Sequence, residues 1–147
     1  MIGNELTPPL RETPGFLLSL VAEAANRQFE AAIATLGLTR YEVGALEAAA
    51  AHPGIVQARL AETLGLFKPK VVPVVGGLVT RGLLHRSPHP QDRRALRIHI
   101  TDPGAALLGR ARAEGTALAL RFLSPLGEEA DSFVAQLGRL AAVHGEM

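Results

Sequence analysis

The 147-residue sequence contains no cysteine and no tryptophan, and it has one tyrosine and five phenylalanines. The absence of cysteine excludes disulfides, thiolate zinc sites, cysteine nucleophiles and cysteine-based redox sensing. No apolar run approaches the roughly 18 residues of a membrane span. The start of the chain also lacks the basic segment followed by an apolar one that marks a signal peptide. We therefore expect a cytoplasmic protein with no membrane partner and with an aliphatic core.

Neither sign of charge dominates the whole chain, because 15 Lys and Arg face 14 Asp and Glu for a net charge of +1. The distribution is uneven. Residues 52–100 hold eight basic and two acidic residues, a net +6, whereas residues 1–51 carry −3 and residues 101–147 carry −2. A basic middle third is consistent with a nucleic-acid partner. A solvated surface cluster is the alternative interpretation, because charge patterning alone discriminates weakly.

Start and stop signals predict six helices and one hairpin. Thr13 and Pro14 open the first helix, which Gly37 ends. Thr39 and Glu42 have the spacing of a capping box at the start of the second helix. The later helices are expected at 57–64, at 68–81, from 101–103 onwards and after a cap at Ser124–Pro125, and the strands at 83–87 and 95–100.

Propensity and periodicity disagree over residues 68–81. Val71, Val75 and Leu78 keep helical spacing. Pro73, however, removes one i→i−4 hydrogen bond, and Gly76 and Gly77 each cost a helix on the order of 1 kcal/mol relative to Ala. We expect a helix here that is distorted or that begins only near Val72.

The order of helices, followed by a hairpin with the basic tip 88–94, is that of a winged helix-turn-helix. Residues 38–104 resemble the MarR family of bacterial transcription regulators in three segments: 59–66, 78–86, and 92–95 with its sequel at Thr101 and Gly104. The third segment, Asp92-Arg93-Arg94-Ala95, looks like the wing motif D-x-R-A followed by L-T-x-x-G and is the most specific of the three. The resemblance implies a mainly α fold with a small β-hairpin wing.

The same resemblance implies a single MarR-like chain over residues 1–147. A winged helix-turn-helix lobe would cover residues 38–100, and helical dimerisation regions would cover 14–37 and 101–147. In the family these terminal regions pack together as a homodimer. A two-fold protein reads two half-sites one duplex turn apart, so the implied partner is a pseudo-palindromic operator in double-stranded DNA.

The predicted DNA contacts lie on the recognition helix and the wing. Lys68 and Lys70 would contact phosphates at the helix start. A wing-tip arginine would enter the minor groove, where Asp92 either holds a guanidinium or only braces the hairpin. Arg86 and Arg97 are expected as backbone contacts or wing supports. The complete predicted set is Lys68, Lys70, Val72, Arg86, Asp92, Arg93, Arg94 and Arg97.

The recognition helix departs from the family pattern. Many members carry Thr or Ser and then a polar or basic residue where this chain has Lys70, Val72 and Pro73. Hydrogen-bonded readout of bases then depends on few residues, and contacts from valines to thymine methyl groups would have to contribute. An alternative hypothesis is a winged-helix scaffold with weak or lost specific DNA binding that acts as a ligand-binding or protein-interaction module.

The family resemblance also implies a repressor that a small molecule releases from DNA. Its pocket would lie between the dimerisation helices and the DNA-binding lobe. The candidate ligand-binding residues are Phe29, Ile33, Tyr41 and residues early in the helix after the wing, although these positions, Ile33 above all, also suit plain core.

Metal binding and catalysis are not expected. His85, His89, Asp92 and His99 all fall in the wing region but lack the spacing of a metal site. No nucleophile elbow, Gly-rich phosphate loop or paired carboxylates in an apolar setting occur. We predict no cofactor and no enzymatic activity.

Overall fold

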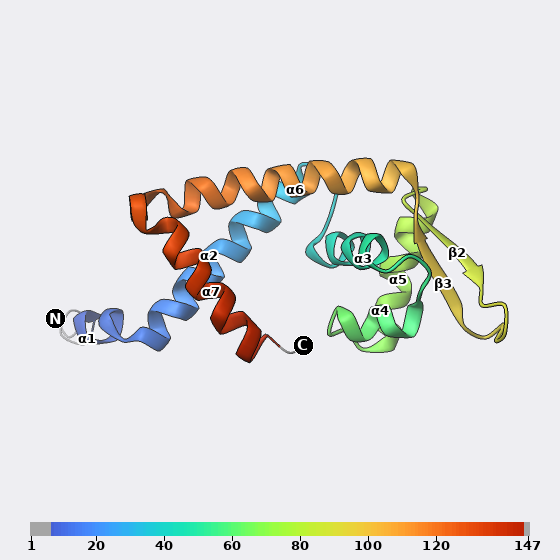
Figure 1. The fold of residues 1–147 in the computed structure, drawn as a ribbon, viewed down its shortest axis with the longest axis horizontal. Helices are drawn as coiled ribbons and strands as arrows, with labels where there is room; N and C mark the ends of the chain where they lie inside the picture. Colours follow the sequence, from blue (N-terminus) through green and yellow to red (C-terminus); the bar gives the residue numbers. More distant parts are fainter. Residues whose placement is uncertain (1–6, 146–147) are drawn as a thin grey trace.

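The computed structural model describes residues 7–145 and is shown in Figure 1. The long helix α6 spans the molecule and joins a helical arm, formed with α2 and α7, to a compact lobe that holds α3, α4, α5 and the wing. The elements in chain order are α1 (Thr7–Glu12), α2 (Pro14–Ala34), α3 (Arg40–Ala51), β1 (Ile55–Val56), α4 (Gln57–Thr63), α5 (Lys68–Thr80), β2 (Leu84–Pro88), β3 (Leu96–Ile100), α6 (Asp102–Leu123), the 3-10 helix η1 (Ser124–Glu129) and α7 (Ala130–His144).

The sequence signals at the start of the lobe are confirmed. Thr39 Oγ1 accepts the backbone N–H of Glu42 at 3.3 Å, and Glu42 Oε2 accepts the backbone N–H of Thr39 at 2.9 Å, which completes the capping box. Gly37 takes a positive φ of 71° after the end of α2. This conformation suits glycine and turns the chain into α3.

The wing is a three-stranded antiparallel sheet rather than the two-stranded hairpin that the sequence predicts. The strand order is β1-β3-β2, with Ile55 paired to Ile98 and His85 paired to His99. The short strand β1 follows Gly54, whose N–H donates to the carbonyl of Ile98. The extra strand fastens the wing to the connection between α3 and α4.

The helix expected over 68–81 is confirmed, whereas its alternative start near Val72 and the cap at Ser124–Pro125 are wrong. Helix α5 is continuous from Lys68 to Thr80 and includes Pro73, so it does not begin near Val72. Burial of Val71, Val75 and Leu78 outweighs the missing hydrogen bond. Ser124 does not cap the last helix, because η1 comes first and Gly127 interrupts it with a φ of 55° before α7 begins.

The core lies beneath the sheet, between α3, α5 and the first half of α6, and it is aliphatic as predicted. Its most completely buried side chains are Ile33, Leu46, Leu60, Val71, Val75, Leu78, Leu84, Ile98 and Leu108. Of these only Ile33 comes from α2. Beyond that point the apolar side chains of α2 and α7 are half-buried or exposed.

Helix α3 is tied by charged groups to three other helices. Arg112 of α6 forms a two-pronged pair with Glu47, with Nε–Oε1 at 2.8 Å and Nη2–Oε2 at 2.6 Å. Arg81, which follows α5, lies 3.8 Å from Glu42 and donates to the carbonyl of Gly37 at 2.9 Å. Arg40 reaches toward Glu30 of α2 at 3.8 Å. These contacts orient the lobe on the arm more than they stabilise it, because exposed ion pairs contribute little free energy.

The bond from Arg112 lowers the pKa of Glu47 below its usual value. The carboxylate therefore stays ionised further into the acid range than a free glutamate. The stabilisation from this pair is present above the ordinary carboxyl pKa and is lost as the pH falls through the lowered one.

No single helix in the described residues is long and apolar enough to cross a membrane. Helices α4 and α5 reach that length and composition only when taken together, and they meet at a bend of 109°.

Gly104 permits a close backbone contact between α6 and Leu83, the residue before β2. A Cβ at this position would collide with the backbone carbonyl of Leu83, whereas a Cβ at Gly109 of the same helix would meet open space. The backbone carbonyl has no rotamer by which to move aside, so a side chain here must separate the two elements.

We expect Gly104→Ala to lower the free energy of unfolding by about 1–3 kcal/mol, the usual cost of overpacking. Gly109→Ala is the matched control and should raise the free energy by roughly 0.5–1 kcal/mol through helix propensity. Urea denaturation of both variants measures whether their free energies of unfolding change in these opposite directions. Equal stability of the two variants would contradict the packing role of Gly104.

Candidate nucleic-acid interface and apolar cavity

The start of α5 and the tip of the wing line a cavity of 320 Å³. It brings together Lys68 and Val72 of the predicted recognition helix with Asp92 and Arg94 of the predicted wing tip. The first residues of α4 complete its wall. Half of the predicted DNA-contacting residues thus gather around one hollow, although 20 residues of sequence separate Val72 from Asp92.

Asp92 braces the hairpin and does not hold a guanidinium. Its Oδ1 accepts the backbone N–H of Arg94 at 3.0 Å, and its carbonyl accepts the N–H of Ala95. Among residues 7–145 it forms no ion pair within 4.0 Å. A carboxylate two residues before an N–H closes a local turn more readily than it reaches a long, mobile arginine.

The wing arginines fall into two kinds. Arg93 and Arg94 are exposed, and neither forms an ion pair within the described chain. Arg97 is half-buried, and its Nη2 lies 3.4 Å from Nε2 of His89. Arg86 is also half-buried and lies opposite Ile98 in the sheet. This arrangement favours Arg97 and Arg86 as wing supports and leaves Arg93 and Arg94 available to a partner.

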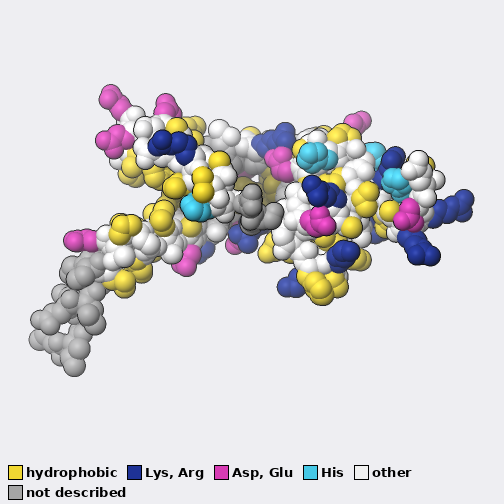
Figure 2. All heavy atoms as spheres, turned by 60° about the horizontal axis from the view of Figure 1, so that its bottom comes forward, with side chains coloured by type: hydrophobic (Ala, Val, Ile, Leu, Met, Phe, Trp, Pro, Cys, Tyr) yellow, Lys and Arg dark blue, Asp and Glu magenta, His cyan; other side chains and the backbone are white. Residues whose placement is uncertain are grey.

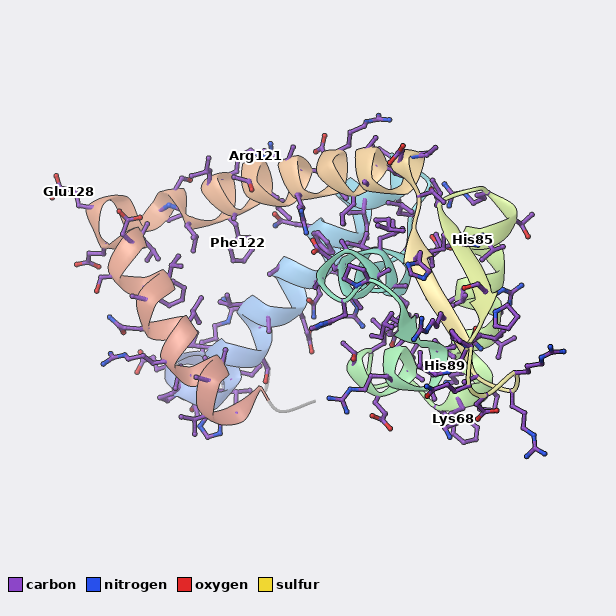
Figure 3. All side chains as sticks on the ribbon, turned by 45° about the vertical axis from the view of Figure 1, so that its right-hand side comes forward. Lys68, His85, His89, Arg121, Phe122 and Glu128 are labelled. Carbon is purple, nitrogen blue, oxygen red and sulfur yellow. The ribbon has the colours of Figure 1, made fainter. Side chains whose placement is uncertain are left out.

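The basic side chains are concentrated at the wing end of the molecule, whereas most of the exposed large apolar side chains lie on the helical arm (Figure 2). Lys and Arg side chains gather at the wing end in Figure 2, while hydrophobic side chains run along the helical arm. Figure 3 places Lys68 and His89 at the lower edge of the lobe and His85 higher on the wing. Lys70, in the first turn of α5, and Val72 are both exposed.

Two candidate residues were missed in the sequence. Gln57 lines the cavity, and its Oε1 is buried without a hydrogen-bond partner in the described residues. Phe67, the residue before α5, is 71% exposed. The sequence signals place Gln57 only at the start of the helix 57–64 and single out no role for Phe67. The position of each residue depends on how α4 and α5 pack at their 109° bend, which sequence periodicity does not reveal.

The histidines of the wing do not assemble a metal site. His85 and His99 face each other across the strands. No group of three or more metal-ligating side chains occurs within residues 7–145.

A second cavity of 740 Å³ lies within the arm, between α2, the second half of α6, and α7. Asn26 is the one polar side chain among its lining residues, which carry no charge. Phe29, Phe122 and Phe133 contribute aromatic rings, and Figure 3 shows Phe122 projecting from α6 toward the other arm helices.

Of the predicted ligand-binding residues, only Phe29 lines this cavity. Ile33 is fully buried in the main core, as its alternative interpretation held. Tyr41 is 42% exposed, and the guanidinium of Arg40 lies 5.5 Å from the centre of its ring. The cavity also uses α6 from Gly115 onwards rather than its early residues.

Comparisons with known proteins all match this chain to transcription regulators. Residues 36–95 match the family model described as MarR family. The chain is 38% identical over 97 residues to a putative transcriptional regulatory protein for the hcr operon from Thauera aromatica, which covers 65% of this chain and 58% of that protein. It is 31% identical over 98 residues to the transcriptional regulator HosA of Escherichia coli O111:H-. This alignment covers 66% of this chain and 73% of that protein. The matched part thus spans less than two thirds of the Thauera protein.

Among solved structures, the transcriptional repressor CouR bound to a 23-mer DNA duplex is similar with a TM-score of 0.80 and 31% identity, over 92% of this chain and 95% of that chain. CouR from Rhodococcus jostii RHA1 bound to p-coumaroyl-CoA is similar with a TM-score of 0.76 and 31% identity, over 91% and 93%. The predicted fold class, mainly α with a small winged sheet, is confirmed.

Proposed function

The chain belongs to the MarR family of transcription regulators, and we propose that it is a homodimeric repressor that binds a pseudo-palindromic operator and leaves it when a small effector binds. As a family member it is a DNA-binding regulator and not an enzyme. The domain division proposed is a DNA-binding lobe at 38–100 and dimerisation regions at 14–37 and 101–147.

The observation that carries the proposal is the grouping of Lys68, Val72 and Arg94 around one hollow at the basic end of the lobe. A recognition helix enters the major groove while a wing reaches the neighbouring minor groove, so both must present their charges on one face. Relatives with this fold include a repressor bound to duplex DNA. The proposed DNA contacts are Lys68, Lys70, Val72, Arg93 and Arg94, and the proposed role of Arg86, Asp92 and Arg97 is to hold the wing in place.

We expect the protein to bind DNA from its own upstream region more tightly than unrelated DNA at the same salt concentration, in a gel-shift titration. Arg94→Ala should weaken that binding and lower the slope of log affinity against log salt by about one unit, since one cationic contact is removed.

Arg110→Ala is the matched control, because Arg110 is an exposed arginine of α6 outside the lobe. It should leave affinity and slope unchanged. Equal binding of the wild-type protein to its upstream DNA and to unrelated DNA would instead support the alternative, a winged-helix scaffold that has lost specific DNA binding.

A second copy of the chain is the proposed cover for the apolar arm. Leu17, Leu18 and Val21 of α2 and Leu137 of α7 line the cavity while 40–60% exposed. Leu140 and Val143 continue the apolar face along α7 at 51% and 72% exposure. Monomeric proteins rarely leave so continuous an apolar surface in water, and a two-fold assembly covers it with the same surface of the partner.

We expect sedimentation at micromolar concentration to give twice the chain mass of 15.5 kDa. Leu137→Arg should shift the protein toward the monomer, because it places a charge within the covered face. Tyr41→Arg is the control, because Tyr41 lies outside the cavity and is 42% exposed, close to the 40% exposure of Leu137. It should leave the dimer intact. A wild-type monomer would refute the dimer.

The proposed effector is an aromatic acid carried as its coenzyme A thioester. The arm cavity offers Phe29, Phe122 and Phe133 to an aromatic ring, and the related CouR has been solved with p-coumaroyl-CoA. An effector that favours a different lobe separation weakens DNA binding by its difference in affinity for the two arrangements.

We expect p-coumaroyl-CoA, used as a probe, to bind the protein in calorimetry and to release it from its upstream DNA. Phe29→Ala should weaken probe binding roughly tenfold, which corresponds to about 1.4 kcal/mol. Tyr41→Ala should not change it. Release of DNA by acetyl-CoA with the same potency would contradict the role of the aromatic group.

A further inference from the structure

The exposed face of α5 carries almost no group that could hydrogen-bond to a base. The helix buries Val71, Val75 and Leu78. At 100° per residue the opposite side consists of Pro69, Pro73, Gly76, Gly77 and Thr80. Thr80 has the one side-chain hydroxyl on this face, and that hydroxyl donates to the carbonyl of Gly76 at 2.9 Å.

Nothing among residues 7–145 explains the two glycines on this face. Their φ values are not positive, and a Cβ at either position would meet no heavy atom within 4 Å among the described residues. Glycine is nevertheless among the poorest residues for a helix interior. A surface outside the chain that approaches the helix backbone more closely than a Cβ allows would account for both.

The charges around the face identify that surface. Lys68 and Lys70 lie at its N-terminal end, and the exposed Arg93 and Arg94 lie on the adjoining wing. This cationic frame around a neutral strip matches a duplex, whose phosphates border a groove of base edges. In the major groove, the one apolar group that base edges present is the C5-methyl group of thymine.

We infer that α5 reads its operator through thymine methyl groups. Val72, which is 50% exposed, and Pro73 contact the methyl groups, while Gly76 and Gly77 let the helix backbone lie against the base edges. The inference rests on the proposed function as a DNA-binding regulator. It assigns specificity to side chains that lack hydrogen-bonding groups and predicts half-sites rich in A·T pairs.

The first test uses duplexes selected by the purified protein from a random pool. In the selected duplex each thymine of a half-site is replaced in turn by deoxyuridine, which removes the methyl group and keeps the O4 acceptor and the base pairing. Affinity should fall roughly fourfold for each contacted methyl group, as expected for one buried carbon. The same replacement outside the half-sites should have no effect.

The second test separates DNA approach from helix stability. Gly76→Ala and Gly77→Ala should each raise the melting temperature by about 2–4 °C while weakening binding to the selected duplex about tenfold or more. Gly109→Ala, whose Cβ also meets open space, should raise the melting temperature without weakening DNA binding.

The outcomes distinguish the two proposals. Tight, selective DNA binding that is unaffected by deoxyuridine, or half-sites rich in G·C pairs, would overturn methyl readout and leave the regulator intact. Alanine variants that are stabilised and bind DNA as well as the wild type would overturn the role of the glycines. Failure to select any duplex would overturn both.

Discussion

One junction fixes how the DNA-facing lobe joins the helical arm. Thr101, between β3 and α6, donates its hydroxyl to the carbonyl of Gly82 at 2.6 Å and accepts the N–H of Gly104 at 3.1 Å. Its own N–H donates to the carbonyl of Leu83 at 3.2 Å. The turn after α5, the last strand of the wing and the first turn of α6 are therefore bonded at a single residue. Movement of α6 at this end must carry the recognition helix and the wing with it.

Local signals predicted the parts of the fold that depend on neighbours in sequence. The capping box of α3 and the glycine after α2 need only residues a few positions apart, and both were found where expected. Strand β1 could not be predicted, because two residues at 55–56 become a strand only through pairing with β3, some 40 positions away. Helix α5 shows the converse, since burial of its valines overrides the weak helix propensity of its proline and glycines.

The candidate site was predicted in outline but not in its contacts. Charge and motif placed Lys68 and Arg94 on the same surface, and the structure puts both around one cavity. Spacing could not show that Asp92 bonds the N–H of Arg94, or that Gln57 enters the same cavity. The candidate ligand-binding residues were harder to predict, because Phe29 and Ile33 are one helical turn apart and only packing decides which faces a cavity and which faces the core.

The length of α6 sets the sensitivity of the whole molecule to small changes in the arm. Its 22 residues make a rod about 33 Å long. A tilt of about 5° at the arm end would move the far end by about 3 Å, close to the 3.4 Å rise of one base pair. In a two-fold assembly both copies of α6 would tilt, so the distance between the two recognition helices would change by up to twice this displacement. The scatter in ordinary helix packing angles is larger than this rotation. A rotation of this size is then enough to change the spacing of the two recognition helices so that it no longer matches the spacing of the half-sites.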